Sequence, residues 1–487
     1  MILERFYEDK IAQATFLVGC PTAGEAIVID PNRDVEAYMR AAAASGLRIT
    51  GVTETHIHAD FVSGSRDLAH RTGARLFVSD AGGEEWRYAF ADEPNVTLLQ
   101  DGSELRAGSV RLQAVHTPGH TPEHLCFLLT DLAATEQPLG AFTGDFIFAG
   151  DVGRPDLLER AVGQAGSADA GARALFHSLQ AFKQRPGHLM LWPAHGAGSA
   201  CGKHLGGVPV TTLAYELLVN EAMRITDEDA FVASILAGQP EPPRYFAEMK
   251  RINRQGPPRI DAFRVPPRLD PEEALNVVES GAVVVDLRRT AEFAKGFAPG
   301  VIALPPSGSF SRYAGTLLPY DRPIYLLGGL ETEVASATRD LALIGIDEVR
   351  GWANPSTVMI GWTHRHGDPE RMVSVSFEDA LPRVESGAAV LLDVRDPSEF
   401  RAGHVPGAMN VPLGQLASRV AELPPDRPIA VHCQSGTRSA IAVSVLRRAG
   451  FTHLANVTGG LDAYAAAGHV VETADGRAPG VASAAGH

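Results

Sequence analysis

The chain has 487 residues, 45% of them apolar, which predicts two to four domains with ordinary globular cores. Its formal net charge of −15 argues against nucleic acid as a partner, because phosphate binding needs a basic surface. No apolar run approaches the roughly 18 residues of a membrane span, and the first residues do not read as a signal peptide. The four cysteines form neither a CxxC pair nor a disulfide framework, so we expect a cytoplasmic protein without a membrane partner.

Short elements alternate over the first half of the chain, which is typical of a mixed α/β domain. Apolar runs bounded by turn residues predict strands, and periodic runs that end at glycine predict helices. The predicted strands include residues 26–30, 48–53 and 75–78, and the predicted helices include residues 35–45, 66–71 and 208–237. We expect residues 1–237 to form the first domain.

Three potential metal ligands, His56, His58 and Asp60, directly follow the strand predicted at 48–53. Alternate residues of an extended segment share a face, so the two histidines can converge on one point. Neutral imidazole and carboxylate suit zinc or non-haem iron rather than calcium or magnesium. One such cluster is only suggestive, because these residues are also common in polar loops.

The same pattern, an apolar strand and then a short loop with a ligand, recurs three times further along the chain. It supplies His120 on a Pro-Gly turn, Asp145 at the end of an apolar run, and His195 after a fourth strand. The arrangement indicates an αββα sandwich with a metal at one edge.

The motifs THIHAD, TPGHT, TGD and PAHG, in this order, resemble those of the metallo-β-lactamase superfamily. Its two-metal members read THxHxDH, and the final histidine helps to hold the second metal. Phe61 occupies that place here. A complete second metal site is therefore not expected.

A single metal held by two histidines and one carboxylate keeps open positions, as in the non-haem Fe(II) oxygenases. This arrangement looks like that of the persulfide dioxygenases, the mononuclear-iron members of the superfamily. The resemblance implies one Fe(II) per chain, held by His56, His120 and Asp145.

The resemblance then assigns the other polar residues to the surroundings of the metal. His58, Asp60 and His195 are expected to orient the ligands or the substrate. The segment GDVGRPDL at 150–157 also resembles the persulfide dioxygenases, and we expect its Arg154 either to orient the ligands or to line the substrate pocket. Cys201 follows the last metal loop, where it either relays sulfur or simply lines the pocket.

Residues 238–268 are rich in proline and mixed in charge, which predicts a linker that packs partly on the first domain. Beyond it the sequence repeats: DLRRTAEFAKGFAPG at 286–300 aligns with DVRDPSEFRAGHVPG at 393–407. Each copy alternates strands and helices. We therefore expect two small α/β domains with parallel sheets, at 269–370 and 371–487.

The second copy places Cys433 between a predicted strand and a predicted helix. Backbone N–H groups and the positive end of the helix dipole stabilise a sulfur anion there. The surrounding sequence closely resembles that of a rhodanese. By that resemblance Cys433 accepts sulfane sulfur as a persulfide, and the loop to Arg438 cradles it through Gln434, Ser435, Gly436 and Thr437.

The first copy lacks these groups. Gly328 aligns with the cysteine and Glu333 with the arginine, so no nucleophile remains and a carboxylate would repel an anion. We expect this copy to act as a structural spacer or a docking surface.

The preferred interpretation joins both halves. An iron centre would oxidise a low-molecular-weight thiol persulfide with O2 to sulfite and thiol, and the rhodanese would make or consume thiosulfate. One alternative is a glyoxalase II-like thioester hydrolase with two zinc ions. Another is a non-catalytic protein that binds persulfide or relays sulfur. A homo-oligomer is the expectation from similar proteins.

Overall fold

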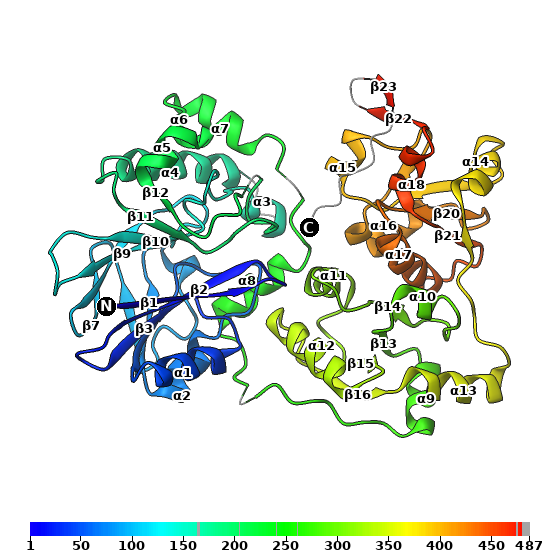
Figure 1. Cartoon of the computed structure of the whole chain (residues 1–487), viewed down its shortest axis with the longest axis horizontal. Helices are drawn as coiled ribbons and strands as arrows, with labels where there is room; N and C mark the ends of the chain where they lie inside the picture. Colours follow the sequence, from blue (N-terminus) through cyan, green and yellow to red (C-terminus); the bar gives the residue numbers. More distant parts are fainter. Residues whose placement is uncertain (163–165, 204, 240, 261, 474–475, 480–487) are drawn as a thin grey trace. The chain divides into compact units, whose positions relative to one another are not determined.

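The computed structural model describes residues 1–162, 166–203, 205–239, 241–260, 262–473 and 476–479 (Figure 1). The chain forms two compact units, of which the first comprises Met1–Ala262 and Ala342–Gly345 and the second comprises the rest. Across the described residues, no helix combines the length and the apolar character that a membrane span requires.

Two six-stranded sheets form the first unit. One sheet has the order β1-β2-β3-β4-β5-β6, with antiparallel pairs up to β3 and parallel pairs from β3 onward. Its strands are β1 (Ile2–Glu8), β2 (Gln13–Cys20), β3 (Glu25–Ile29), β4 (Arg48–Thr53), β5 (Arg75–Ser79) and β6 (Val96–Leu99). The other sheet has the order β12-β11-β10-β9-β8-β7. It consists of β7 (Glu104–Ala107), β8 (Val110–His116), β9 (Leu125–Asp131), β10 (Gly140–Gly144), β11 (Met190–Pro193) and β12 (Thr211–Thr212).

Side chains along a strand of this unit alternate between two hydrophobic cores, one under the helices and one between the sheets. In β2, Leu17 packs with Tyr38 of the helical layer, whereas Phe16 lies between the two sheets with Phe127 of β9. Successive side chains of a strand point to opposite faces, so one strand serves two cores.

Helices α1 (Val35–Ala44) and α2 (Ser65–Thr72) cover the first sheet, and α4 (Ser167–Phe182) and α7 (Glu228–Leu236) cover the second (Figure 1). Shorter helices are α3 (Leu157–Val162), α5 (Leu213–Val219) and α6 (Glu221–Arg224). The predicted αββα sandwich is confirmed.

The segment predicted as a linker contains helix α8 (Phe246–Gln255). Phe246, Met249, Lys250 and Asn253 are buried, which is the spacing of one helix face. Their burial places α8 in the first unit, which extends to Ala262. Sequence periodicity missed the helix because the prolines on either side dominate the local signal.

The second unit holds two parallel sheets with the same strand order. The sheet of the first copy runs β14-β13-β15-β16 and that of the second runs β19-β18-β20-β21, with β17 added beside β21. The strands of the first copy are β13 (Val283–Asp286), β14 (Ile302–Ala303), β15 (Ile324–Leu327) and β16 (Val349–Ala353). Those of the second copy are β17 (Ser374–Val375), β18 (Val390–Asp393), β19 (Met409–Asn410), β20 (Ile429–His432) and β21 (Leu454–Val457), and β22 (Val470–Thr473) and β23 (Gly476–Pro479) form a separate hairpin.

The helices of this unit likewise divide between the copies. The first copy has α9 (Pro271–Glu279), α10 (Thr290–Phe293), α11 (Phe310–Leu317), α12 (Glu331–Leu343) and α13 (Pro355–His366). The second has α14 (Phe377–Glu385), α15 (Pro397–Ala402), α16 (Leu416–Arg419), α17 (Thr437–Arg448) and α18 (Gly460–Ala466). The expected parallel sheets are confirmed. The boundaries predicted at 268 and 370 stay predictions, since both copies belong to one compact unit.

Candidate metal centre and sulfur-transfer site

The three predicted metal ligands meet at one edge of the sandwich. His56 follows β4, His120 follows β8, and Asp145 follows β10. Their donor atoms all lie within 4.8 Å of one another, and all three side chains are buried. Asp145 Oδ2 lies 3.9 Å from His56 Nε2 and 3.5 Å from His120 Nε2.

Hydrogen bonds on the far side of each ring fix which nitrogen faces this point. The Thr55 hydroxyl donates to Asp30 Oδ2 at 2.9 Å, so it accepts from His56 Nδ1 at 3.0 Å. His120 Nδ1 donates to the carbonyl of Arg154 at 3.1 Å. Both Nε2 atoms therefore carry a lone pair toward Asp145, which is the form that binds a metal.

The charges at this point also fit a cation. Burial lowers the pKa of His120 to about 4 and, with the neighbouring His58, holds the pKa of His56 well below its usual value, so both rings are neutral. Burial opposes ionisation of Asp145, but the facing His195 holds the pKa of its carboxyl well below the usual range. Neither carboxylate oxygen has a hydrogen-bond partner among the described residues. Two neutral imidazoles and an unsatisfied carboxylate suit a divalent metal.

A second group of donors, Asp60, His195 and Cys201, lies beside the first. His195 Nδ1 donates to the Ala12 carbonyl at 2.9 Å, and its Nε2 lies 3.2 Å from Asp145 Oδ1 and 3.3 Å from Asp60 Oδ2. Burial opposes protonation, but the facing Asp145 raises the pKa of His195 well above its usual value. His195 thus joins the carboxyl groups of Asp60 and Asp145 beside the three predicted ligands.

His58 points away from the first group of donors. Its Nε2 lies 3.1 Å from Asp30 Oδ1, and its ring packs on Phe61 with the centroids 4.4 Å apart. Burial would lower the pKa of His58, but Asp30 raises it to about 9. His58 thus anchors the loop through Asp30, while Phe61 fills the adjacent space.

Arg154 supports the site through its backbone and its side chain. Its carbonyl accepts from His120, and its guanidinium donates to Asp156 at 2.7 and 2.8 Å and to the carbonyl of Ala200 at 3.1 Å. The side chain is fully buried. Its side chain therefore holds the loop before Cys201, and its carbonyl orients the ring of His120.

Two residues that hold the metal loops were missed in the sequence. His124 accepts from the Asp145 backbone N–H at 3.1 Å, and its Nδ1 lies 2.8 Å from Thr117 Oγ1; burial lowers its pKa to about 3. Asn253 of α8 donates to the carbonyls of His58 and Phe61. His124 follows TPGHT closely and could have been considered, whereas Asn253 lies in the supposed linker and gave no signal.

The thiol of Cys433 lies at the carboxyl end of β20 and is buried. The Gly436 N–H donates to its Sγ at 3.1 Å, and the Ser439 hydroxyl lies 3.7 Å from the same atom. Gly436 has φ +110°, a value that favours glycine, so the loop can turn into α17. The predicted cradle of backbone amides therefore has at least one amide directed at the sulfur.

Contacts from neighbouring elements hold this loop in place. Gln434 donates to Asp462 at 2.5 Å and accepts from Arg395 at 3.2 Å. Arg438 donates through both terminal nitrogens to Glu399, at 2.6 and 2.8 Å. Ser435 and Thr437 occupy the loop, with no side-chain hydrogen bond to the sulfur. Arg438 therefore approaches the thiol already paired with a carboxylate.

The corresponding loop of the first copy is filled by its own side chains. Glu333 accepts from the backbone N–H of Gly329 at 2.9 Å. In the other copy, a backbone N–H of this loop donates to the thiol instead. A Cβ atom at Gly328 would lie 2.6 Å from Val334 Cγ2. The loop thus has room neither for a cysteine nor for an anion.

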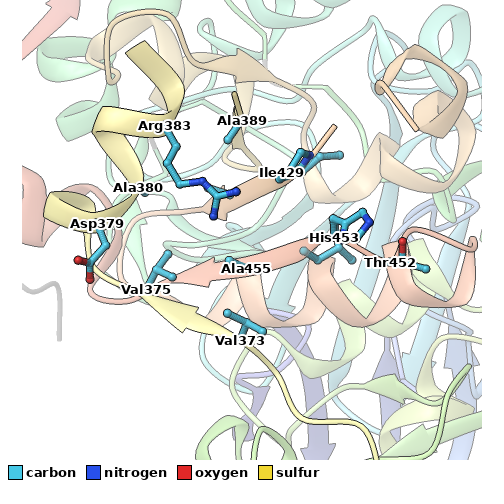
Figure 2. Close-up of a pocket in the computed structure, with 13 residues that line it drawn as sticks. Val373, Val375, Asp379, Ala380, Arg383, Ala389, Ile429, Thr452, His453 and Ala455 are labelled. Carbon is cyan, nitrogen blue, oxygen red and sulfur yellow. The ribbon is translucent and has the colours of Figure 1, made fainter. Parts of the chain in front are cut away.

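A cavity of the second copy lies away from the Cys433 thiol. It has a volume of about 240 Å³ and is lined by β17, β20, β21 and α14, with Arg383 extending into it (Figure 2). Its lining includes Ile429, the first residue of β20, whereas Cys433 follows the last. The cavity and the thiol therefore lie at opposite ends of the same strand.

A sandwich with imidazole and carboxylate donors at one edge, followed by a thiol at the end of a parallel strand, defines a metal-binding domain joined to a thiol-bearing α/β domain. The family model of the metallo-beta-lactamase superfamily matches residues 10–195, and that of the rhodanese-like domain matches residues 376–467. A solved metallo-beta-lactamase from Staphylococcus aureus is 38% identical, with a TM-score of 0.65, over 73% of this chain and 99% of its own. The chain belongs to the metallo-beta-lactamase superfamily and carries a rhodanese-like domain, so the predicted fusion is confirmed.

Curated relatives of the sandwich include enzymes of two kinds. The mitochondrial persulfide dioxygenase of Bos taurus is 26% identical over 275 residues, which are 55% of this chain and 87% of that protein. The hydroxyacylglutathione hydrolase of a Polaromonas strain is 34% identical over 155 residues, 31% of this chain and 54% of that protein. The first similarity thus spans much more of both chains.

Proposed function

We propose that the chain oxidises the persulfide of a low-molecular-weight thiol with O2 at one Fe(II), and that its rhodanese-like domain transfers sulfane sulfur. The observation that carries this proposal is the buried group of His56, His120 and Asp145, with Phe61 at the place where the two-metal members have a histidine. Similarity to a persulfide dioxygenase over 87% of its length supports the same reaction.

When bound, the metal supplies the redox chemistry and the open coordination positions. One persulfide, one O2 and one water give one thiol, one sulfite and two protons, so O2 takes up the electrons that the sulfane sulfur loses. The protein holds the ligands: Thr55 and the Arg154 carbonyl keep the Nδ1 protons of His56 and His120. The Nε2 atom of His195 lies 3.2 Å from Asp145 Oδ1 and 3.3 Å from Asp60 Oδ2, so its ring keeps the two carboxyl groups together beside the metal ligands.

The Cys433 thiolate carries the second reaction. It attacks the outer sulfur of thiosulfate, the S–S bond of thiosulfate breaks, and sulfite leaves with the bonding electrons. The product is a persulfide on Cys433, which the Gly436 amide and the α17 dipole stabilise. In the opposite direction sulfite accepts the sulfane sulfur and forms thiosulfate.

Metal analysis of anaerobically purified protein, combined with O2 uptake on glutathione persulfide, tests the proposal. We expect one iron per chain, O2 uptake with sulfite release, and loss of both in His120→Ala. Cys433→Ser is the matched control, since it should abolish sulfur transfer from thiosulfate while O2 uptake continues. Two zinc ions per chain with thioester hydrolysis and no O2 uptake would instead establish the hydrolase.

A further inference from the structure

The buried face of helix α8 reaches the metal loop of the sandwich. Asn253 donates to the carbonyls of His58 and Phe61 at 2.8 and 2.7 Å, and accepts from the Ser63 N–H at 2.9 Å. These bonds fix α8 against the loop that carries the first ligand. A side chain one turn earlier on the same face therefore has a defined position near the metal centre.

That side chain is Lys250, which is 7% exposed. Its Nζ has no hydrogen-bond partner among the described residues and lies 4.6 Å from the ring centroid of Trp86. Contact with an aromatic face stabilises a cation but supplies no acceptor for its three N–H groups. A buried ammonium that lacks an acceptor is costly unless something else pairs with it.

The charged groups that face Lys250 come from the metal centre. Burial lowers its pKa to about 8, against the opposing effects of Glu123, Cys201 and Asp145. Glu123 is itself buried; its Oε1 accepts from the Ile57 N–H at 2.8 Å, and its Oε2 has no hydrogen-bond partner among the described residues. Lys250 thus stands in the electric field of the ligand group without being paired to any of its members.

We propose that Lys250 binds an anionic group of the persulfide substrate and positions it beside the metal centre. The inference rests on the proposed function, which supplies two anions of suitable chemistry. One is the sulfur end of the substrate, the persulfide or the sulfite that it becomes. The other is a carboxylate of the thiol carrier. In either case the ammonium acts as a counter-ion and does not react.

Calorimetric binding to the anaerobic, iron-loaded full chain tests the inference without turnover. The probes are sulfite, glutathione and the neutral thiol 2-mercaptoethanol, and every protein carries Cys433→Ser so that the second site does not react. Lys250→Gln is compared with Lys250→Arg, which keeps the charge. Arg251→Gln is the matched control, because it removes a cation from the exposed side of the same helix.

We expect Lys250→Gln to lower the affinity for at least one anion about 10-fold or more. Lys250→Arg should restore most of this affinity, and Arg251→Gln should leave the affinities unchanged. Weaker sulfite binding identifies the sulfur end, and weaker glutathione binding alone identifies the carrier. Equal affinities in wild type and Lys250→Gln, an equal loss for the neutral thiol, or no anion binding to wild type would overturn the inference.

If Lys250→Gln retains no iron, Lys250→Met beside Trp86 replaces it and is judged by the same outcomes. Failure of the proposed function appears separately, as absent O2 uptake.

Discussion

The ring of Phe61 lies against the ring of His58, with the two centroids 4.4 Å apart, and both side chains are buried. The contact places an apolar group where the two-metal members of the superfamily have a ligand. The His58 ring in turn pairs with Asp30 through Nε2. Asp60, His195 and Cys201 therefore form a second group of donors without the imidazole that the two-metal members have at the place of Phe61.

Phe61→His is therefore expected to create a second metal site. The new imidazole would directly follow Asp60 in the chain, and the donor atoms of Asp60, His195 and Cys201 lie within 4.8 Å of one another. After dialysis against zinc, metal analysis should give about two ions per chain, compared with about one for wild type. Phe61→Leu is the control, and we expect it to keep one ion. Equal metal content in all three proteins would show that Phe61 does not limit the site.

Asn253→Ala tests whether α8 belongs functionally to the sandwich. The change removes three hydrogen bonds to the metal loop and leaves buried carbonyls unsatisfied, which should lower the free energy of unfolding by about 3 kcal/mol. Urea unfolding measures this loss, and competition with a chelator should show weaker metal binding.

The exposed Asn95 offers a matched control for this change, because Asn95→Ala should cost less than about 0.5 kcal/mol. If Asn253→Ala were as stable as Asn95→Ala and held metal equally well, α8 would be only a covering element.

The sequence predicted the sandwich, and it singled out His56, His120, Asp145 and Cys433 because each follows an apolar strand; their roles as metal ligands and as sulfur acceptor stay predictions. It did not predict the contribution of α8, since Lys250 and Asn253 lie outside all four motifs, in a segment flanked by prolines. The sequence marked Arg154 but could not show which atoms it contacts. Only the fold shows that its carbonyl accepts from His120 and that its guanidinium donates to Asp156 and to the Ala200 carbonyl.

His58 is expected to make stability depend on pH in the metal-free protein. Its folded pKa of about 9 lies above the ordinary value of 6.5, so its contribution is fully present below pH 6.5 and is lost as the pH rises through 9. The shift corresponds to about 3 kcal/mol. The difference in free energy of unfolding between wild type and His58→Gln should shrink by roughly this amount from pH 6 to pH 10. A difference that stays constant over this range would mean that the Asp30–His58 pair does not hold an extra proton.

The first rhodanese-like copy should regain sulfur transfer only when its loop is cleared. In a chain with Cys433→Ser, the double change Gly328→Cys and Glu333→Arg restores the nucleophile and the arginine of the other copy. The new Cβ would still lie 2.6 Å from Val334 Cγ2, however, so we expect no persulfide to form.

Val334 occupies the place of Ser439, whose hydroxyl lies 3.7 Å from the Cys433 sulfur in the intact copy. Adding Val334→Ser should therefore both remove the clash and supply a donor to the sulfur. Mass spectrometry after incubation with thiosulfate should find the added sulfane sulfur on the introduced thiol in the triple variant but not in the double variant. Persulfide formation in the double variant would show that the loop opens without help. Its absence from both would mean that the first copy lacks more than these three side chains.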